Sequence, residues 1–182
     1  IHDNSIRLLS IINDVIDFSK IEAGIIDIHP SWVSVGSIIT QTTDLFERDT
    51  PVPIISKCEN PELEIFTDPT KVTQILTNLL GNAIKFTRVG QIHIGVESMK
   101  NDQIRFYVED TGIGIPQEQQ RTIFERFVQG PSHKNQINKG LGMGLPVISA
   151  YADRLNGDTE LQSELNVGSK FSLVLPLRYL SS

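Results

Sequence analysis

The hydrophobic pattern of this chain switches repeatedly between the 3.6-residue period of a helix and the two-residue period of a strand. Helical spacing predicts helices at 35–48, 69–86 and 145–155, and alternation predicts strands at 24–29, 54–59, 63–67, 91–98, 103–109, 159–163 and 170–175. Elements in this order bury their apolar faces when helices cover a sheet. The sequence therefore predicts an α+β fold, an α/β sandwich whose mixed, mostly antiparallel sheet has helices packed on one face.

Local signals indicate where several of these elements begin and end. Asp68 can cap the helix that follows it, with Pro69 in the first turn, where proline is tolerated. Residues 99–102 suit a hairpin turn. Residues 129–140 are rich in Gly, Pro, Ser and Asn and have no periodicity, which predicts a long loop.

The first residues predict a separate amphipathic helix. Leu8, Ile11, Val15 and Phe18 recur at spacings of three and four. Such a stripe needs a partner, which is either a helix bundle or coiled coil or, as the open alternative, the chain's own domain. Gly24 follows as a stop signal for this helix.

Composition and charge exclude several classes of function. The 182 residues suffice for one domain with a two-layer core and a short appendage. The net charge of −6 argues against nucleic-acid binding, which needs a basic footprint. Cys58 is the only cysteine and the four histidines are scattered, so neither a disulfide scaffold nor a Cys/His metal cluster is expected. No apolar run is long enough to span a bilayer, and the first residues do not resemble a signal peptide.

A first group of polar residues lies on the predicted helix 69–86. Asn78, Asn82 and Lys85 recur at spacings of four and three, so they share one face of the helix. Two carboxamides and an ammonium group in a row can offer an oxygen to a metal ion and a positive charge to a phosphate. A solvated polar face is the alternative reading.

A second group follows the predicted strand 103–109. Asp110 offers an acceptor suited to an exocyclic amine, and Gly112 and Gly114 permit a sharp turn and a close approach by a flat ligand. A tight strand-to-helix turn with an Asp cap explains the same residues without any ligand.

A third group precedes the predicted helix 145–155. Gly140, Gly142 and Gly144 alternate with other residues, and successive N–H groups before a helix N-terminus form a cradle for anions. The spacing matches neither the P-loop nor the dinucleotide fingerprint. A flexible hinge is the alternative.

In this order and spacing, the three groups resemble the motifs of the sensor histidine kinase family. Residues 78–86 resemble its N box, 110–114 its G1 box, 123–127 its F box and 140–144 its G2 box. Residues 19–24 resemble the end of the family's second dimerisation helix, especially in hybrid kinases, and residues 168–177 resemble its final strands. The likeness covers essentially the whole chain.

The resemblance implies a role for each site residue. ATP is expected between the N-box helix and a lid loop, with adenine at Asp110 and the adjoining turn of Gly112 and Gly114. Asn82 is expected to ligate Mg²⁺, with Asn78 assisting and Lys85 meeting phosphate oxygens.

The same resemblance assigns the lid. Gly140, Gly142 and Gly144 are expected to let backbone N–H groups approach the phosphates. Phe124 and Phe127 are expected to anchor the lid, and core filling is the competing reading for both phenylalanines.

By the resemblance, residues 1–22 are the C-terminal part of the second dimerisation helix, 23–29 a linker and 30–182 the ATP-binding catalytic domain. The phosphoacceptor histidine belongs to a first dimerisation helix that is missing here, and His2 lacks the proline that usually follows the acceptor. The fragment is therefore expected to bind ATP without phosphorylating itself.

The resemblance also implies partners and place. The parent protein is expected to be a cytoplasmic or membrane-anchored homodimer that works in two-component signal transduction with a response regulator receiver domain. Two alternatives stay open. An ATP hydrolase of the same superfamily needs a glutamate to activate water where Asn78 stands here, and a non-catalytic dimerisation or signalling module needs no intact site.

Overall fold

The computed structural model describes residues 16, 19–21, 23–46, 50–123 and 144–178. The described strands and helices are, in chain order, β1 (Ser31–Ser34), α2 (Val35–Asp44), β2 (Ile54–Cys58), β3 (Glu64–Thr67), α3 (Pro69–Phe86), β4 (Ile92–Ser98), β5 (Gln103–Asp110), α4 (Gln117–Gln120), α5 (Gly144–Arg154), β6 (Asp158–Glu164) and β7 (Gly168–Pro176).

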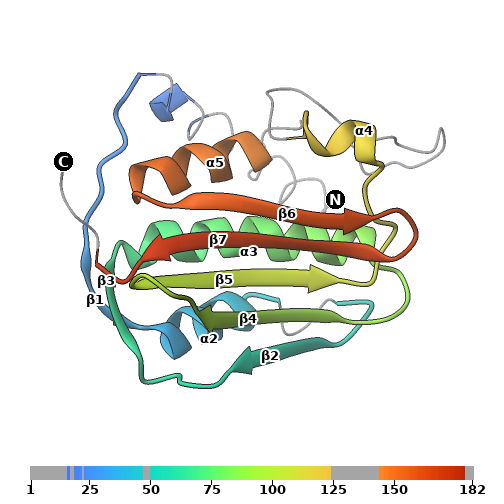
Figure 1. The fold of residues 1–182 in the computed structure, drawn as a ribbon, viewed down its shortest axis with the longest axis horizontal. Coiled ribbons are helices and arrows are strands. Elements are labelled where there is room, and N and C mark those ends of the chain that lie inside the picture. The colour runs from blue at the N-terminus through green and yellow to red at the C-terminus, as the bar shows by residue number, and fades with distance from the viewer. Residues whose placement is uncertain (1–15, 17–18, 22, 47–49, 124–143, 179–182) are drawn as a thin grey trace, which may run out of the picture.

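The main sheet has five strands in the order β2-β4-β5-β7-β6 (Figure 1). β2 runs parallel to β4, and the other neighbouring pairs are antiparallel. In the turn between β4 and β5, Asn101 and Asp102 have φ angles of 64° and 55°. Asn and Asp adopt this left-handed region more readily than other residues with a side chain. The predicted mixed, mostly antiparallel sheet is confirmed.

Helix α3 has the predicted bounds. The Asp68 carboxylate accepts a hydrogen bond from the backbone N–H of Lys71, and Pro69 lies in the first turn, where no donor is lost. The helix buries one apolar face made of Val72, Ile75, Leu76, Leu79, Leu80 and Ala83. The capping residue and the apolar periodicity are both local signals, so the bounds of this helix can be predicted from the sequence alone.

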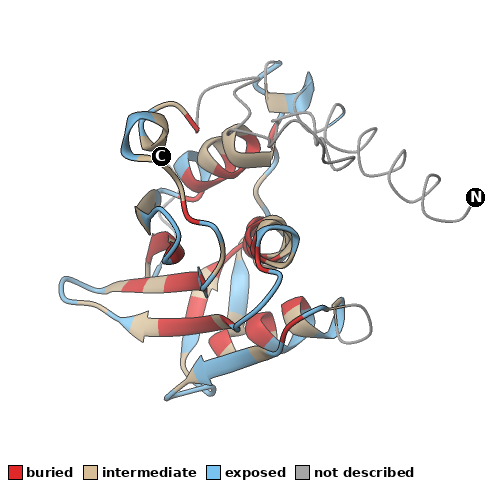
Figure 2. Cartoon of the chain, turned by 90° about the vertical axis from the view of Figure 1, so that its right-hand side faces the viewer, coloured by how far each residue is buried: buried red, intermediate tan, exposed pale blue. Residues whose placement is uncertain are grey.

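The core lies between the helices and one face of the sheet (Figures 1 and 2). The sheet contributes alternate residues of its central strands, including Ile94, Ile104, Phe106, Leu173 and Leu175, all of them fully buried. From the helices come Ile38, Leu76, Leu80, Ile148 and Tyr151. This arrangement confirms the predicted sandwich with helices on one face.

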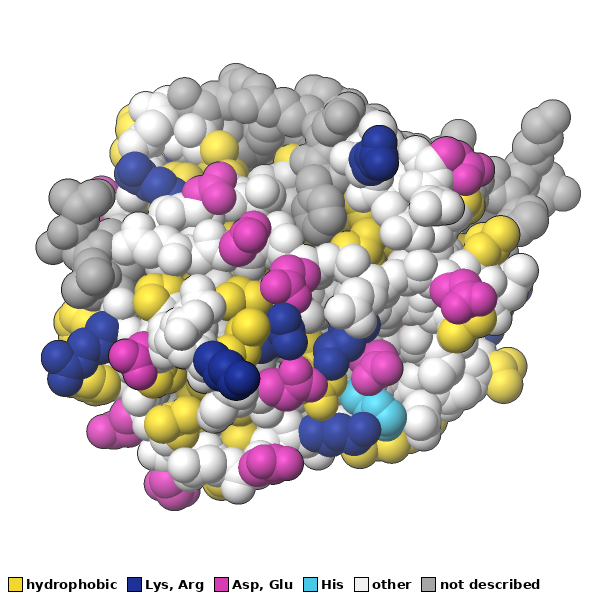
Figure 3. All heavy atoms as spheres, viewed as in Figure 1, with side chains coloured by type: hydrophobic (Ala, Val, Ile, Leu, Met, Phe, Trp, Pro, Cys, Tyr) yellow, Lys and Arg dark blue, Asp and Glu magenta, His cyan; other side chains and the backbone are white. Residues whose placement is uncertain are grey.

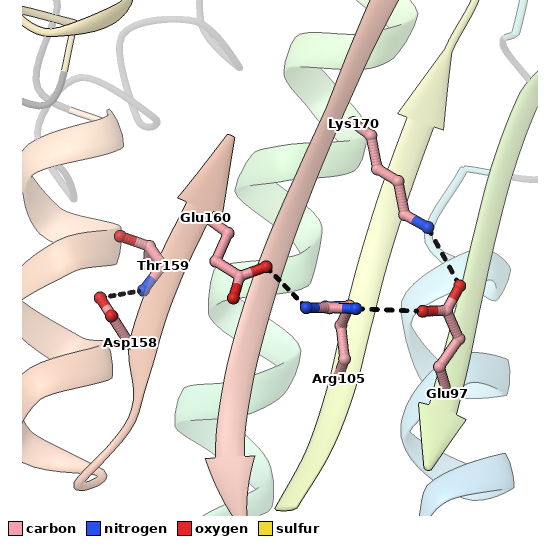
Figure 4. A network of polar contacts seen from close by, with 6 residues as sticks. All are labelled: Glu97, Arg105, Asp158, Thr159, Glu160 and Lys170. Carbon is pink, nitrogen blue, oxygen red and sulfur yellow. Dashed lines mark hydrogen bonds and ion pairs between the residues drawn. The ribbon is translucent and has the colours of Figure 1, made fainter. Parts of the chain in front are cut away.

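The opposite face of the sheet is polar. Acidic and basic side chains are interspersed over it, with no single sign dominating (Figure 3). Four of them, from all four antiparallel strands, are linked by ion pairs: Glu97, Arg105, Glu160 and Lys170 (Figure 4). Antiparallel sheets commonly have one face in the core and the other in solvent.

The prediction of a strand at residues 24–29 is wrong. The segment is extended and alternates, with Ile26 buried between exposed Ile25 and Asp27, yet it pairs with no described strand. The strand lies just beyond it, where β1 pairs with β3 in a separate two-stranded sheet. Alternation of apolar and polar residues indicates which side chains are buried, not whether the backbone pairs with another strand. In this segment, side chains from elsewhere in the chain, rather than a neighbouring strand, form hydrogen bonds with backbone groups.

Gly24 ends the short helical segment at residues 19–21, as predicted. Its φ is +68°, and the N–H groups of Gly24 and Ile25 bond the carbonyl oxygens of Ile21 and Lys20. This is a Schellman ending, which favours glycine. The amphipathic positions Leu8, Ile11, Val15 and Phe18 and the predicted loop 129–140 lie outside the described residues. Across the part of the chain that the structure describes, no helix combines the length and the apolar character that a membrane crossing requires.

Candidate nucleotide-binding site

Two elements finish at the same end of the sheet, and a third is directed toward it. Helix α3 and strand β5 both end there, and the start of α5 faces that end, because α5 runs back to the opposite end of the sheet, where β6 begins (Figure 1). The backbone N–H of Ile113, just after β5, donates to the carbonyl of Phe86 at the end of α3, at 3.4 Å. The N-box and G1-box residues predicted from the sequence are thus on adjoining segments.

The polar face of α3 carries the first group of predicted site residues. Asn78 and Asn82 are half-buried and one turn apart, while Leu79, Leu80 and Ala83 face the core. Lys85 is exposed in the last turn, and its Nζ lies 4.9 Å from the centre of the Phe86 ring. The second half of the helix, which ends beside the turn after β5, therefore carries two half-buried carboxamides and an exposed cation.

Asp110 is the last residue of β5 and is only 8% exposed. Its Oδ1 accepts a hydrogen bond of 2.8 Å from the N–H of Gly112. Burial raises the pKa of the Asp110 carboxyl, and hydrogen bonds from the backbone N–H groups of Gly112 and Ser169 offset part of that rise. Because burial disfavours the charged form of this carboxylate even with these hydrogen bonds, a further donor from a ligand would stabilise it.

Thr87 is a candidate site residue that the sequence did not single out. It is fully buried beside Asp110, and its hydroxyl comes close enough to lower the pKa of that carboxyl. The geometry nevertheless falls short of a hydrogen bond with any described group, so Thr87 Oγ1 is a buried polar atom left for another partner. The only sequence signal was a hydroxyl residue immediately after the predicted helix 69–86.

Gly112 and Gly114 are required by protein packing. A Cβ atom on Gly112 would lie 2.5 Å from the carbonyl oxygen of Phe86, and one on Gly114 would lie 1.9 Å from that of Glu164. Gly114 also has a φ of +65°. Through these contacts the turn after β5 is held against α3 on one side and the β6–β7 turn on the other. Backbone packing by itself thus explains both glycines, and the close approach of a ligand at this turn stays a prediction.

Gly144, the first residue of α5, differs from these two glycines. A Cβ atom there would meet no described atom within 4 Å, so none of its described neighbours requires glycine at this position. Gly140 and Gly142, and Phe124 and Phe127, lie outside the described residues. The anion cradle and the lid anchors therefore stay predictions.

The described residues fit a magnesium nucleotide. Thr87 supplies an unpartnered buried hydroxyl next to the Asp110 carboxylate, and amide oxygens such as those of Asn78 and Asn82 are ligands that Mg²⁺ accepts. Among the described residues no cluster of three or more His, Cys, Asp or Glu side chains could hold a metal by itself. Mg²⁺ usually keeps its waters and binds through few protein groups plus substrate phosphates, which suits such a site.

On an α/β sandwich, a helix with two half-buried carboxamides ends beside the turn that follows a buried aspartate, and this combination fits the class of nucleotide-binding domains. Comparison with known families narrows it. Residues 67–179 match the family described as histidine kinase-, DNA gyrase B-, and HSP90-like ATPase, and the chain belongs to that family.

Several relatives carry the name of sensor kinases. The chain is 33% identical over 181 residues to the autoinducer 2 sensor kinase/phosphatase LuxQ of Vibrio harveyi. The alignment covers 94% of this chain and 21% of the relative. The chain is 36% identical over 174 residues to the signal transduction histidine-protein kinase BarA of Escherichia coli. That alignment covers 91% of this chain and 19% of the relative. The chain thus spans about a fifth of the length of these curated relatives.

Solved structures agree in fold. The crystal structure of full-length ShkA in complex with AMPPNP superposes with a TM-score of 0.84 and 29% identity, over 96% of this chain and 37% of that one. The catalytic domain of the histidine kinase ThkA superposes with a TM-score of 0.71 and 26% identity, over 82% of this chain and 97% of that one.

Proposed function

We propose that this chain is the ATP-binding catalytic domain of a sensor histidine kinase, in which it donates the γ-phosphoryl group of ATP to a histidine. The relatives named as histidine kinases support this, as does the site at the end of α3 and β5. Residues 30–182 form the catalytic domain in this proposal, residues 23–29 a linker and residues 1–22 the end of a dimerisation helix.

The observation that carries the proposal is the amide at position 78. The family includes ATPases as well as kinases. Hydrolysis needs a general base to activate water, and a carboxamide cannot take up a proton at neutral pH. Asn78 lies one turn before Asn82 on the same face of α3. The site can therefore hold ATP without activating water at this position, which favours transfer to another acceptor.

The residues of the chain act mainly by positioning. Phosphoryl transfer needs alignment and charge neutralisation more than covalent chemistry from the protein. Asp110, which lies beside Thr87, accepts a hydrogen bond from the exocyclic amine of adenine. This bond fixes the adenine end of the nucleotide. Asn78 and Lys85 orient the phosphates, and Gly144, together with Gly140 and Gly142, offers backbone N–H groups to them.

Asn82 is the proposed magnesium ligand, through its amide oxygen. Bound Mg²⁺ would supply positive charge that offsets the negative charge of the phosphates. Phe124 and Phe127 are proposed to anchor the lid over the nucleotide. The proposed partners are a phosphoacceptor histidine on the dimerisation domain and a receiver domain, in a cytoplasmic homodimer that acts in a phosphorelay.

The test mixes this chain with Mg-ATP and a separately produced dimerisation domain that contains the acceptor histidine. Acid-labile, base-stable phosphate on that domain is the expected result. Release of inorganic phosphate without labelling of the partner identifies an ATP hydrolase instead. Absence of Mg-ATP binding in calorimetry identifies a non-catalytic module.

A further inference from the structure

The segment that leads into the ATP-binding domain is packed against it. Ile26 is buried in the core, and Ile28 packs against that core. Residues 25–30 form neither helix nor strand, so their backbone groups need partners outside any ladder. Two side chains from distant parts of the sequence supply them.

Arg154, in the last turn of α5, supplies the first attachment. Its Nη2 donates to the carbonyl oxygen of Ile26 at 3.0 Å and lies 3.4 Å from that of Gly24. These two carbonyls belong to the glycine that ends the preceding helical segment and to the second residue after it. A single guanidinium therefore fixes the direction in which the chain leaves that helix.

Asp68 supplies the second attachment. Its Oδ1 caps α3 through the N–H of Lys71, and its Oδ2 accepts 2.8 Å from the N–H of His29. The carboxylate is only 2% exposed, which strengthens both bonds. The start of α3 and the end of the segment are thus joined by one buried side chain.

Both attachments are made by the helices that form the nucleotide site. Helix α3 carries Asn78 and Asn82 toward its far end, and α5 begins at Gly144 and ends at Arg154. Lys71 and Tyr151 join the two helices, with Nζ 4.6 Å from the ring centre. The segment is therefore attached to the ends of α3 and α5 that lie opposite the site.

We propose that Arg154 is a positioning residue for phosphoryl transfer: with Asp68, it forms a linker clasp on residues 24–29 that orients the nucleotide site relative to the preceding helix. This rests on the proposed function, in which that helix belongs to the acceptor domain. A loosened segment samples more orientations, so a smaller fraction of encounters aligns the phosphate with its acceptor. Arg154 touches neither nucleotide nor acceptor and acts through the segment alone.

The experiment compares Arg154→Ala and Arg154→Lys in the full-length protein that carries this chain. Arg154→Ala is expected to lower kcat for autophosphorylation at least ~5-fold while KM for ATP stays within about twofold, since only alignment is lost. Lysine can donate to one carbonyl and should restore part of the rate. Hydrogen exchange of the amides at 25–29 should speed up in the alanine variant. Lys100→Ala, an exposed change in the β4–β5 turn, is the matched control.

Each outcome decides the question. An unchanged or faster rate in Arg154→Ala, with the wild type active, overturns the linker clasp alone. So does a rise in KM that accounts for the whole loss, because it places the defect in nucleotide binding. A wild-type protein that binds Mg-ATP but transfers no phosphoryl group overturns the proposed function, and the positioning role with it.

Discussion

The guanidinium of Arg105 on β5 reaches across β7 to the carboxylate of Glu160 on β6, with a distance of 2.8 Å between Nη2 and Oε2 (Figure 4). Nη1 of the same side chain lies 3.5 Å from Glu97 on β4, and Lys170 on β7 donates to Glu97 at 3.0 Å. The network joins the four antiparallel strands on the face that no helix covers.

Arg105→Met is therefore expected to destabilise the domain by about 1–2 kcal/mol, between the values for exposed and buried pairs. Methionine keeps most of the packed stem but leaves the Glu160 carboxylate without its cation. Urea unfolding near neutral pH measures the change. Lys57→Met, on an exposed residue of β2, is the control and should stay within about 0.5 kcal/mol of wild type. Equal effects of the two changes would show that the network adds nothing.

Glu97 gives the network a dependence on pH. Burial by itself raises the pKa of Glu97, but the hydrogen bonds and charges of Lys170 and then Arg105 outweigh it, and the pKa is lowered from its ordinary value of 4.5. The stability that Glu97 contributes is thus fully present above pH 4.5 and is lost as the pH falls through the lower folded value. The stability difference between wild type and Glu97→Gln should shrink on acidification over that window. A difference that stays constant with pH contradicts this.

Sequence reasoning succeeded where local signals and burial agree. Helix α3 was fixed by the Asp68 cap and an uninterrupted apolar stripe, and the β4–β5 hairpin by its turn residues. It failed at β1, since four residues give too little alternation to locate a strand and the better pattern lay at 24–29. Ladder pairing depends on β3, which approaches from elsewhere in the chain.

The site divides in the same way. The sequence could propose Asn78, Asn82 and Asp110 as candidate site residues because each belongs to a patterned element. Thr87 could not, because its significance arises only when the turn after β5 folds against the end of α3 and buries the hydroxyl. Packing likewise requires glycine at position 114 because of the β6–β7 turn. The contacting residue there, Glu164, lies fifty positions later in the sequence.

Asp110→Asn should separate stability from binding. Burial raises the pKa of Asp110, so the stability linked to this group is present below its ordinary value of 3.8 and is lost as the pH rises through the raised folded value. At neutral pH the ionised carboxylate is a cost, and asparagine can still accept from Gly112. The melting temperature is expected to be equal to or above that of wild type.

The same Asp110→Asn variant should lose roughly 10- to 100-fold in ATP affinity, because a hydrogen bond to a charged acceptor is removed. Its preference for ATP over GTP should fall as well. Calorimetry with both nucleotides measures this. Unchanged discrimination in a folded variant would place the adenine elsewhere.

Gly114→Ala and Gly144→Ala form a matched pair. Alanine at 114 meets a φ of +65° and a carbonyl oxygen at 1.9 Å, so a loss of about 2–4 kcal/mol in unfolding free energy is expected. Alanine at 144 meets no described atom within 4 Å and should leave stability nearly unchanged while weakening ATP binding. Denaturant unfolding and calorimetry on both variants check this. A stable Gly114→Ala protein would contradict the packing role, and wild-type ATP affinity in Gly144→Ala would contradict the phosphate contact.

Asn82→Ala tests the metal ligand. The side chain is half-buried on the polar face of α3, so its loss should change stability by no more than about 1 kcal/mol. ATP affinity in the presence of Mg²⁺ should fall at least ~10-fold, whereas the weaker affinity measured with EDTA should hardly change, because only the metal-dependent part is lost. Gln41→Ala, an exposed amide on α2, is the control for truncating a helical carboxamide. An equal loss with and without Mg²⁺ would mean that Asn82 contacts the nucleotide directly, and the metal-ligand role would then have to pass to another oxygen on α3.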